Sequence, residues 1–265
     1  MQKGEVNEKK KVPVVQILAG VFAGVLLIIV LVFVLAILPL QNATEAYNSV
    51  VEEYNAAAED YNSMLSLTCV DNLDGFPESA ENLEMVNEDL FSVMKSFLGG
   101  NTAKKTQADM ATLKAITEYL SDDTKIMEQI TAPSEAWVME RLGRVEDILE
   151  IQPVTSDNDP NGLLHQENGG YTACIYFTST GIETAGDSPV SRGTDGGGAV
   201  EVYSTVQDAE ARCEYLSGFD NTILYTGSYA ILGTMVVRIS YAYTDEAQYE
   251  MTDRIAKAFT QLETA

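Results

Sequence analysis

A long uncharged run, VPVVQILAGVFAGVLLIIVLVFVLAILPL, extends from Val12 to Leu40 near the N-terminus. An α-helix needs about 20 predominantly apolar residues to cross a bilayer, so this run is long enough to span one with some tilt. The apolar core of a cleaved signal peptide is shorter, at roughly 7–15 residues. The run therefore predicts a single transmembrane helix over residues 12–40 that acts as a signal-anchor, with a buried core helix as the alternative.

The basic residues near this run indicate its orientation. Four lysines precede it, and they are Lys3, Lys9, Lys10 and Lys11. The next basic residue is Lys95, far beyond the end of the run. Because positively charged flanks stay in the cytoplasm, we expect residues 1–11 to form a cytoplasmic tail and residues 41–265 to lie outside the cytoplasm.

The composition excludes several classes of function. The net charge of −24 repels phosphate backbones, so nucleic acid is not an expected partner. Three cysteines are too few for a disulfide framework, and without a CxxC pair they predict no zinc site. The single histidine, His165, has no identifiable carboxylate to orient it as a catalytic base. We therefore expect no catalytic residues and no enzyme activity.

The stretch AYNSVVEEYNAAAEDYNSML has the spacing of a short coiled coil. Tyr47, Tyr54 and Tyr61 recur at seven-residue intervals, and an apolar residue follows each tyrosine three positions later. Such a helix could pair with a second copy of the chain, or its seam could pack on later helices of the same chain. The repeat is short and Ala57 is a weak core residue, which favours packing within the chain.

Three further helices are expected before residue 133. Gly75 and Pro77 end the first helix, and apolar periodicity then predicts a helix from Ser79 to Leu98. Gly99 and Gly100 end that one, a third helix follows to about Leu120, and a short helix covers Thr124–Ile130. Residues 41–132 are thus expected to form an extracytoplasmic stalk or small bundle of antiparallel helices.

The periodicity changes after Pro133, which marks the start of a second region. Val138, Leu142, Val145 and Leu149 predict one helix over residues 134–149. Alternating stretches such as YTACIYFTS, GAVEVYST and GTMVVRISY then predict strands, and TVQDAEARCEYLSGF and the residues after Thr244 predict helices. Residues 133–265 are therefore expected to form an α+β module, with a mostly antiparallel sheet and helices packed against one face.

Four stretches of this region occur in a fixed order, namely APSEAWVMERLGRVEDILEIQPVTSDNDPNG, GGYTACIYF, GTDGGGAVEVYSTVQDAEARCEYL and GSYAILGTMVVRIS. In residues and order they resemble the C-terminal module of uncharacterised membrane- or lipid-anchored surface proteins of Gram-positive bacteria, some of which are labelled EbhA-like. The resemblance covers residues 133–265 and implies a bacterial extracytoplasmic location and a shared fold. It implies no activity, because no function is established for that group.

A charged residue in the middle of a strand suggests a first candidate ligand site. Arg238 lies within MVVRIS, and Glu201 occupies a similar place in AVEVYS. Two explanations remain: a cross-strand ion pair, which we favour, or an arginine presented to an acidic ligand on an open sheet face. In the second case Tyr203 and Tyr241 would flank the ligand.

The loop TSDNDPNGLLHQEN suggests a second candidate, a calcium site formed by Asp157, Asp159, Asn161 and Glu167. The loop lacks the bidentate glutamate at position 12 of an EF-hand, where this chain has Asn168. Asp159-Pro160-Asn161-Gly162 instead fits a type I turn in which Asp159 accepts backbone hydrogen bonds. We therefore expect a turn first, and calcium only as a weakly bound ion.

Cys174 and Cys213 are expected to be buried free thiols, since cysteine is among the most buried residues, and a disulfide between them is the alternative. The function expected from the sequence is that of a non-catalytic interaction module at the bacterial cell envelope, binding an envelope protein, a peptide or a wall polymer. The alternative is an envelope sensor or enzyme accessory that depends on weakly bound calcium or an anionic ligand.

Overall fold

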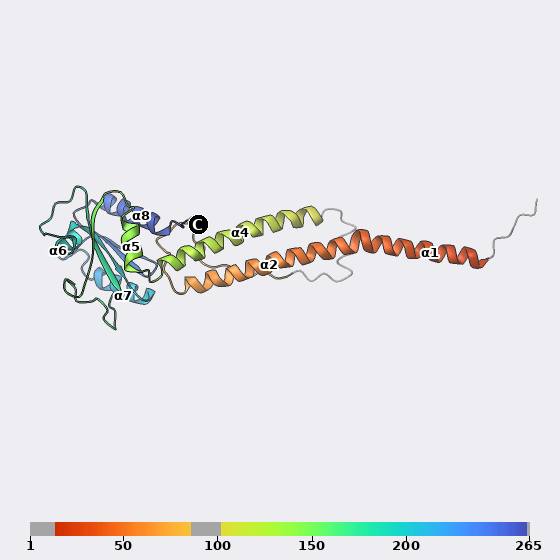
Figure 1. The fold of residues 1–265 in the computed structure, drawn as a ribbon, viewed down its shortest axis with the longest axis horizontal. Helices are drawn as coiled ribbons and strands as arrows, with labels where there is room; N and C mark the ends of the chain where they lie inside the picture. Colours follow the sequence, from red (N-terminus) through yellow and green to blue (C-terminus); the bar gives the residue numbers. More distant parts are fainter. Residues whose placement is uncertain (1–13, 86–101, 264–265) are drawn as a thin grey trace, which may run out of the picture. The chain divides into compact units, whose positions relative to one another are not determined.

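The computed structural model describes residues 14–85 and 102–263, which belong to two compact units (Figure 1). The first unit contains Met1–Tyr54 and Leu83–Ala115, and the second contains Asn55–Asn82 and Ile116–Ala265. The second unit includes the whole of residues 133–265 and adds residues 55–82 and 116–132 to them. The α+β module is thus completed by the ends of two helices that precede it in the sequence.

The described part of the first unit is helical except for residues 83–85. It contains α1 (Val14–Val32), the π-helix η1 (Phe33–Ile37), the first part of α2 (Leu38–Leu65) and the start of α4 (Thr102–Ile130). The predicted span is therefore divided among α1, η1 and the beginning of α2. Within the part of the chain that the structure describes, no helix is both long enough and apolar enough to cross a membrane. The span stays a prediction, and its residues 12 and 13 and the tail 1–11 lie outside the described residues.

Helix α2 carries the tyrosine repeat, and its buried residues are Val50, Val51, Tyr54, Ala58 and Tyr61. Tyr47, Ala57 and Met64, the other members of the predicted seam, are only half-buried. The Tyr61 hydroxyl donates a hydrogen bond to the carbonyl oxygen of Pro77. This contact agrees with packing within the chain, whereas self-association through the repeat stays a prediction.

The helix predicted for Ser79–Leu98 is wrong over residues 79–85, which are neither helix nor strand, and residues 86–98 lie outside the described residues. The side chain of Asn62 holds the backbone of Ala80 at both polar atoms. Its Nδ2 donates to the Ala80 carbonyl at 2.7 Å, and its Oδ1 accepts from the Ala80 N–H at 2.9 Å. In a helix beginning at Ser79, the Ala80 carbonyl would accept from the N–H four residues later, and Asn62 occupies this carbonyl instead.

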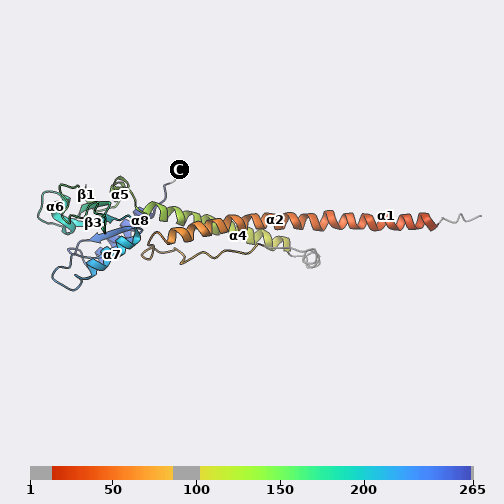
Figure 2. The same cartoon turned by 90° about the horizontal axis from the view of Figure 1, so that it is seen from below.

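Helices α2 and α4 both end at the hairpin between the last two strands. Cys69, just beyond α2, forms an isolated antiparallel bridge with Gly233, and the carbonyl oxygen of Ile130, at the end of α4, accepts from the Thr234 N–H. Both helices therefore end at the same hairpin, and their C-terminal ends lie side by side in both views (Figures 1 and 2). The antiparallel arrangement was expected of helices that follow one another in the sequence. The helix expected between this pair is absent over residues 79–85 and otherwise lies outside the described residues, so the arrangement stays a prediction. Helix α4 is also continuous over residues where two helices were expected.

The second unit is built on a five-stranded sheet in which all neighbouring strands are antiparallel, in the order β1-β2-β3-β5-β4. The strands are β1 (Ile148–Pro153), β2 (Ala173–Ser179), β3 (Gly197–Val202), β4 (Tyr229–Leu232) and β5 (Met235–Ile239). The α+β class and the antiparallel sheet expected from the alternating stretches are confirmed. Strand β4 is an edge strand, and the bridge at Gly233 places the segment after α2 at the end of its hairpin.

Helices cover both faces of this sheet. Helix α7 (Val206–Ser217) packs on one face, where Ala209 and Leu216 join Cys174, Tyr176 and Val236. Helices α5 (Glu135–Leu142) and α8 (Asp245–Thr260) cover the other face, and the short α6 (Pro189–Arg192) and 3₁₀ helix η2 (Gly193–Gly196) precede β3. Every residue of β2 and β3 is buried. The expectation of helices on one face only is therefore wrong.

Helix α5 is shorter than predicted. Ser134 is its N-cap and accepts from the Trp137 N–H, and Gly143 ends it. Leu149, expected on the apolar face of a helix, lies in β1 and is 66% exposed. The buried side chain of Arg141 donates to the carbonyl oxygens of Ala258 and Gln261 at 3.1 and 2.8 Å. This guanidinium stabilises the C-terminal end of α8, where unpaired carbonyls carry partial negative charge.

Candidate functional site

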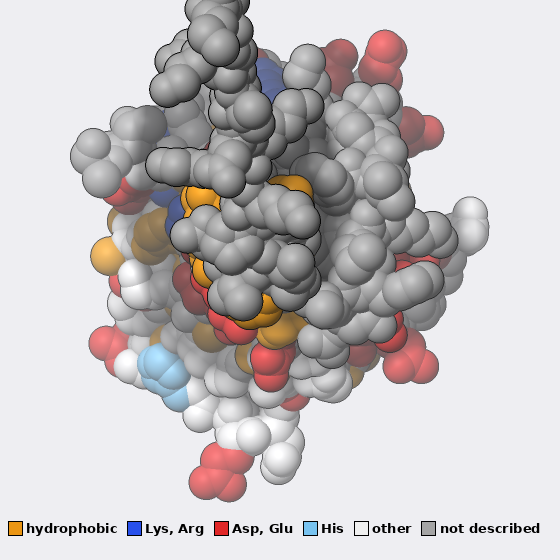
Figure 3. Space-filling view, turned by 90° about the vertical axis from the view of Figure 1, so that its right-hand side faces the viewer, with side chains coloured by type: hydrophobic (Ala, Val, Ile, Leu, Met, Phe, Trp, Pro, Cys, Tyr) orange, Lys and Arg blue, Asp and Glu red, His pale blue; other side chains and the backbone are white. Residues whose placement is uncertain are grey.

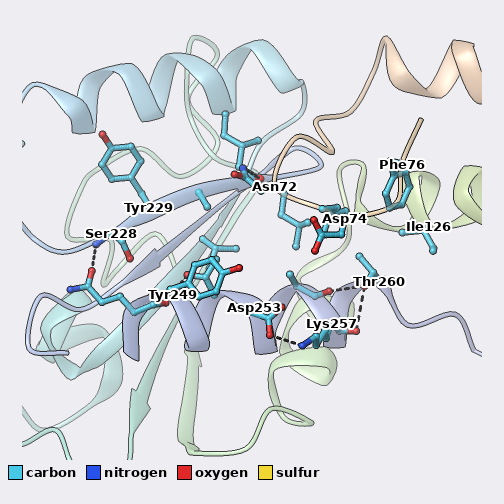
Figure 4. A pocket seen from close by; sticks show the side chains of 18 of the residues that line it. Asn72, Asp74, Phe76, Ile126, Ser228, Tyr229, Tyr249, Asp253, Lys257 and Thr260 are labelled. Carbon is cyan, nitrogen blue, oxygen red and sulfur yellow. Dashed lines mark hydrogen bonds and ion pairs between the residues drawn. The ribbon is translucent and has the colours of Figure 1, made fainter. Parts of the chain in front are cut away.

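A cavity of about 660 Å³ lies beside β4 and α8 in the second unit and could receive a ligand (Figure 4). Its apolar wall comes from four parts of the chain: Phe76 from the segment after α2, Ile126 from α4, Ala230 and Leu232 from β4, and Val237 from β5. Ligand cavities usually enclose about 300–1,000 Å³, so this one has the size of a small-molecule site. We call it the α8 cavity.

The edge of β4 positions the segment that closes one side of the α8 cavity. Asn72 Nδ2 donates to the Ile231 carbonyl oxygen at 2.8 Å, and Cys69 exchanges two backbone hydrogen bonds with Gly233. Gly233 has a φ of +64°, and a Cβ there would lie 2.0 Å from the carbonyl oxygen of Ile130. A glycine is thus required where the ends of α2 and α4 meet the hairpin.

The buried side chain of Gln248 positions the opposite side. Its Oε1 accepts from the Ser228 N–H at 2.7 Å, and its Nε2 donates to the Tyr243 carbonyl oxygen at 3.0 Å. These bonds attach the start of β4 to the first turn of α8. Figure 4 shows Asp74 and Tyr249 entering the cavity region from different segments, with the Asp253–Lys257 pair on α8.

The charged residues that line the α8 cavity are mostly acidic. They are Asp74, Asp123, Asp245, Asp253 and Lys257. The ammonium group of Lys257 lies 2.6 Å from an oxygen of Asp253, so its charge is already paired. The net charge of the other charged residues in the lining is negative. This charge favours a cation in the cavity over an anion.

Asp123 differs from the other carboxylates because the protein buries it. Its side chain is 6% exposed, and its Oδ2 accepts no hydrogen bond. Burial, and secondarily the charge of Asp122, raises the pKa of Asp123 from 3.8 to about 6. The carboxylate thus titrates close to neutral pH within the wall of the cavity.

None of the residues predicted as sites, all of which lie in the described part of the chain, lines the α8 cavity. One signal in the sequence could have found Asp123. It lies on the buried stripe of α4 together with Leu120, Met127 and Ile130, at helical spacing. An aspartate at such a position is uncommon, since charged residues are rarely fully buried without a partner.

The sheet-face candidate is a buried ion cluster. Glu201 is fully buried, and its Oε1 accepts from Arg238 Nη1 at 2.9 Å. It also accepts from Nε and Nη2 of Arg212 at 2.8 Å each, and from the Tyr203 hydroxyl at 2.9 Å. Burial alone would raise the pKa of Glu201, but the hydrogen bond from Arg212 and the charge of Arg238 hold it below its usual value.

These contacts correct the idea of an open sheet face, because α7 covers it. The predicted pairing of Glu201 with Arg238 is present, whereas the second partner, Arg212, was missed in the sequence. Tyr241 lies beyond the end of β5 and is 54% exposed, so it does not flank the cluster. Binding of an acidic ligand by these residues stays an untested prediction.

The calcium candidate contains the side-chain hydrogen bonds expected of Asp159, whereas residues 160–162 form a bend and no type I turn hydrogen bond joins Gly162 to Asp159. Asp159 Oδ1 accepts from the Asn161 N–H at 2.9 Å and from the Tyr171 hydroxyl, and its Oδ2 accepts from the Leu164 N–H at 2.8 Å. Burial raises the pKa of Asp159, but these hydrogen bonds outweigh it and the net shift is downward. Asp157 and Glu167 are exposed. In residues 14–85 and 102–263 no group of three or more His, Cys, Asp or Glu side chains could hold a metal ion.

All three cysteines are free thiols. Cys174 is fully buried, and burial raises its pKa well above 9.0. Cys213 is half-buried against the α7 face, and burial raises its pKa to about 12. The expectation of a buried free thiol is confirmed for Cys174.

Comparisons with known proteins identify no relative. No family model matches the chain, and neither a curated protein nor a solved structure matches it. The resemblance to anchored Gram-positive surface proteins therefore stays an expectation from the four quoted stretches.

Proposed function

We propose that this chain is a bacterial envelope protein, anchored in the membrane by residues 12–40, whose extracytoplasmic α+β module binds a small molecule in the α8 cavity without converting it. The α8 cavity carries this proposal. It joins an apolar wall from four segments to a few polar groups, which is the usual composition of a ligand site.

Binding is favoured over catalysis by the side chains that line the cavity. Among the described residues, no histidine and no cysteine lines it. The buried amide of Gln248 is occupied in holding backbone groups. The lining thus offers neither the usual imidazole base nor a thiol nucleophile.

The location outside the cytoplasm rests on the sequence. Four lysines precede the uncharged run and none follows it until Lys95. The face shown in Figure 3 carries many acidic and few basic side chains in its described part, as expected for a chain of net charge −24. Such a surface would be repelled by anionic lipid headgroups, so we assign membrane attachment to the uncharged run alone.

A cavity-filling variant tests the ligand proposal. Ala256 lines the cavity from α8, and Ala256→Trp should fill part of it. Full-length protein purified from its own membranes should carry a small molecule detectable by native mass spectrometry, and Ala256→Trp should lose it. Ala211→Trp, at an exposed position of α7, is the control and should keep it. If both variants keep the small molecule equally, the α8 cavity is not its binding site.

A pair of reporter fusions tests the orientation. A reporter active only outside the cytoplasm should work when fused at Ala265. The same reporter fused at Gln2 should be silent. The reverse pattern would show that the module lies in the cytoplasm.

The alternative, a sensor or enzyme accessory that needs weak calcium or an anionic ligand, takes second place. The carboxylates of the α8 cavity would repel an anion. The oxygens of Asp159 already accept three hydrogen bonds within the protein, which leaves them poorly available to calcium.

A further inference from the structure

Asp123 brings a buried carboxylate into the lining of the α8 cavity, and within the described residues no basic side chain forms an ion pair with it. The charge of Asp123 contributes to the raised pKa values of the Tyr61 and Tyr119 hydroxyls. Both hydroxyls donate their hydrogen bonds to other groups. Tyr61 donates to the Pro77 carbonyl and Tyr119 to the Gly75 carbonyl, so neither satisfies Oδ2. Burial of a carboxylate without a counter-charge is unfavourable, and a bound cation that reaches the carboxylate from the cavity would supply that charge.

The remainder of the cavity favours a donor that carries positive charge. Asp74 and Asp245 add two carboxylates to the lining, whereas the charge of Lys257 is paired with Asp253. Tyr225 and Tyr249 add aromatic rings to the same lining, and the faces of such rings attract cations. The apolar wall, which includes Ile126, Leu232 and Val237, can pack against the hydrocarbon part of such a ligand.

We propose, on the basis of the function proposed above, that the α8 cavity binds a small organic molecule bearing a primary ammonium group, which donates a hydrogen bond to the carboxylate of Asp123. A primary ammonium has three donors, whereas a quaternary ammonium has none. The hydrocarbon part of the ligand packs against the apolar wall. A free alkylamine or diamine is the simplest molecule with both parts.

This contact makes binding depend on pH. The raised pKa of Asp123, about 6, means that its carboxylate is protonated below that value and charged above it. Affinity for an ammonium group should be level above pH 7 and fall by up to about tenfold per pH unit below 6. The other charged or titratable groups that surround Asp123 or share its cavity are Asp122, Tyr119, Tyr61, Asp74, Asp245, Asp253 and Lys257. Tyr61, with a pKa raised to about 12, stays neutral throughout this range.

Calorimetry with matched probes tests the proposal. Full-length protein is titrated at pH 8 with 1,5-diaminopentane and with 1,5-pentanediol, which has a similar length and no charge. The diamine should bind and the diol should not. Asp123→Asn should weaken diamine binding at least tenfold, and Glu128→Gln, on an exposed position of the same helix, should leave it unchanged. A circular dichroism melt verifies that each variant is folded.

Three results would overturn the proposal: equal binding of the diol, undiminished binding by Asp123→Asn, or equal binding of tetramethylammonium. The failure of this proposal can be separated from that of the proposed function. If the diamine does not bind but Ala256→Trp still loses a co-purified molecule, the cavity binds a ligand of another class. If wild-type protein carries no ligand and binds no diamine, both proposals fail.

Discussion

Glu201 on β3 accepts two hydrogen bonds from Arg212 on α7, each 2.8 Å long, in the fork geometry typical of arginine and carboxylate. The pair joins a helix to the centre of the sheet, and Arg238 on β5 adds a third member. A carboxylate with no exposure is tolerated here because two guanidinium groups and a tyrosine hydroxyl surround it.

Glu201→Gln should destabilise the protein strongly. Two buried guanidinium groups would lose their common counter-charge, and breaking a buried ion pair in this way typically costs about 3–5 kcal/mol. Denaturant unfolding followed by circular dichroism measures the loss. Glu214→Gln, on the exposed side of α7, should stay within about 0.5 kcal/mol of wild type. Equal stabilities for both variants would show that the cluster is dispensable.

The titration of Asp123 should lower stability as pH rises. Its folded pKa, about 6, lies above its ordinary value of 3.8, so the folded protein holds this proton more tightly than the unfolded chain. The unfolding free energy of wild type should therefore fall relative to Asp123→Asn between pH 4 and pH 6, then stay level. A shift of this size corresponds to at most about 3 kcal/mol. Parallel stability profiles for the two proteins would contradict the raised pKa.

Gly233→Ala should destabilise the hairpin far more than Gly162→Ala. Both glycines have a φ of +64°, which an alanine adopts at a cost of about 1–2 kcal/mol. At Gly162 the added Cβ meets nothing within 4 Å, whereas at Gly233 it meets the Ile130 carbonyl oxygen at 2.0 Å. We expect a total loss of about 4 kcal/mol or more at Gly233. Similar melting temperatures for both variants would show that the hairpin accommodates the added Cβ without a large loss of stability.

Asp159→Ala should lower the melting temperature even when no calcium is present. The variant removes the acceptor of two backbone N–H groups and of the Tyr171 hydroxyl, a loss of about 1–3 kcal/mol. Asp157→Ala, at an exposed position, should have little effect, and a chelator should not shift the melting temperature of wild type. A calorimetric calcium Kd below roughly 10⁻⁶ M would instead indicate a dedicated metal site.

Alkylation of the native protein should leave Cys174 unmodified. The thiol is fully buried, and its raised pKa keeps it protonated at pH 8. Mass spectrometry after treatment with iodoacetamide should detect modification of Cys174 only when denaturant is added. Unreduced, denatured protein should then react at all three cysteines, and failure of Cys174 and Cys213 to react would reveal a disulfide between them.

Features that depend on neighbouring residues could be predicted from the sequence. Helix α7 lies within the stretch TVQDAEARCEYLSGF, and α8 begins directly after Thr244, as the sequence predicts. The alternating stretches became β2, β3 and β5 of an antiparallel sheet. Asp159 accepts the hydrogen bond expected of a turn residue. Each of these depends on backbone groups a few residues away, which is why a local pattern is sufficient.

Features that depend on distant segments were decided only by the tertiary structure. Asn62 holds Ala80 out of a helix, α7 covers the face of Glu201, and Arg212 supplies a charge that no strand pattern contains. The α8 cavity likewise exists only because α4, β4, α8 and the segment after α2 meet around Asp123. Burial and desolvation arise from such contacts between remote parts of the chain, and the order of residues along one element does not record them.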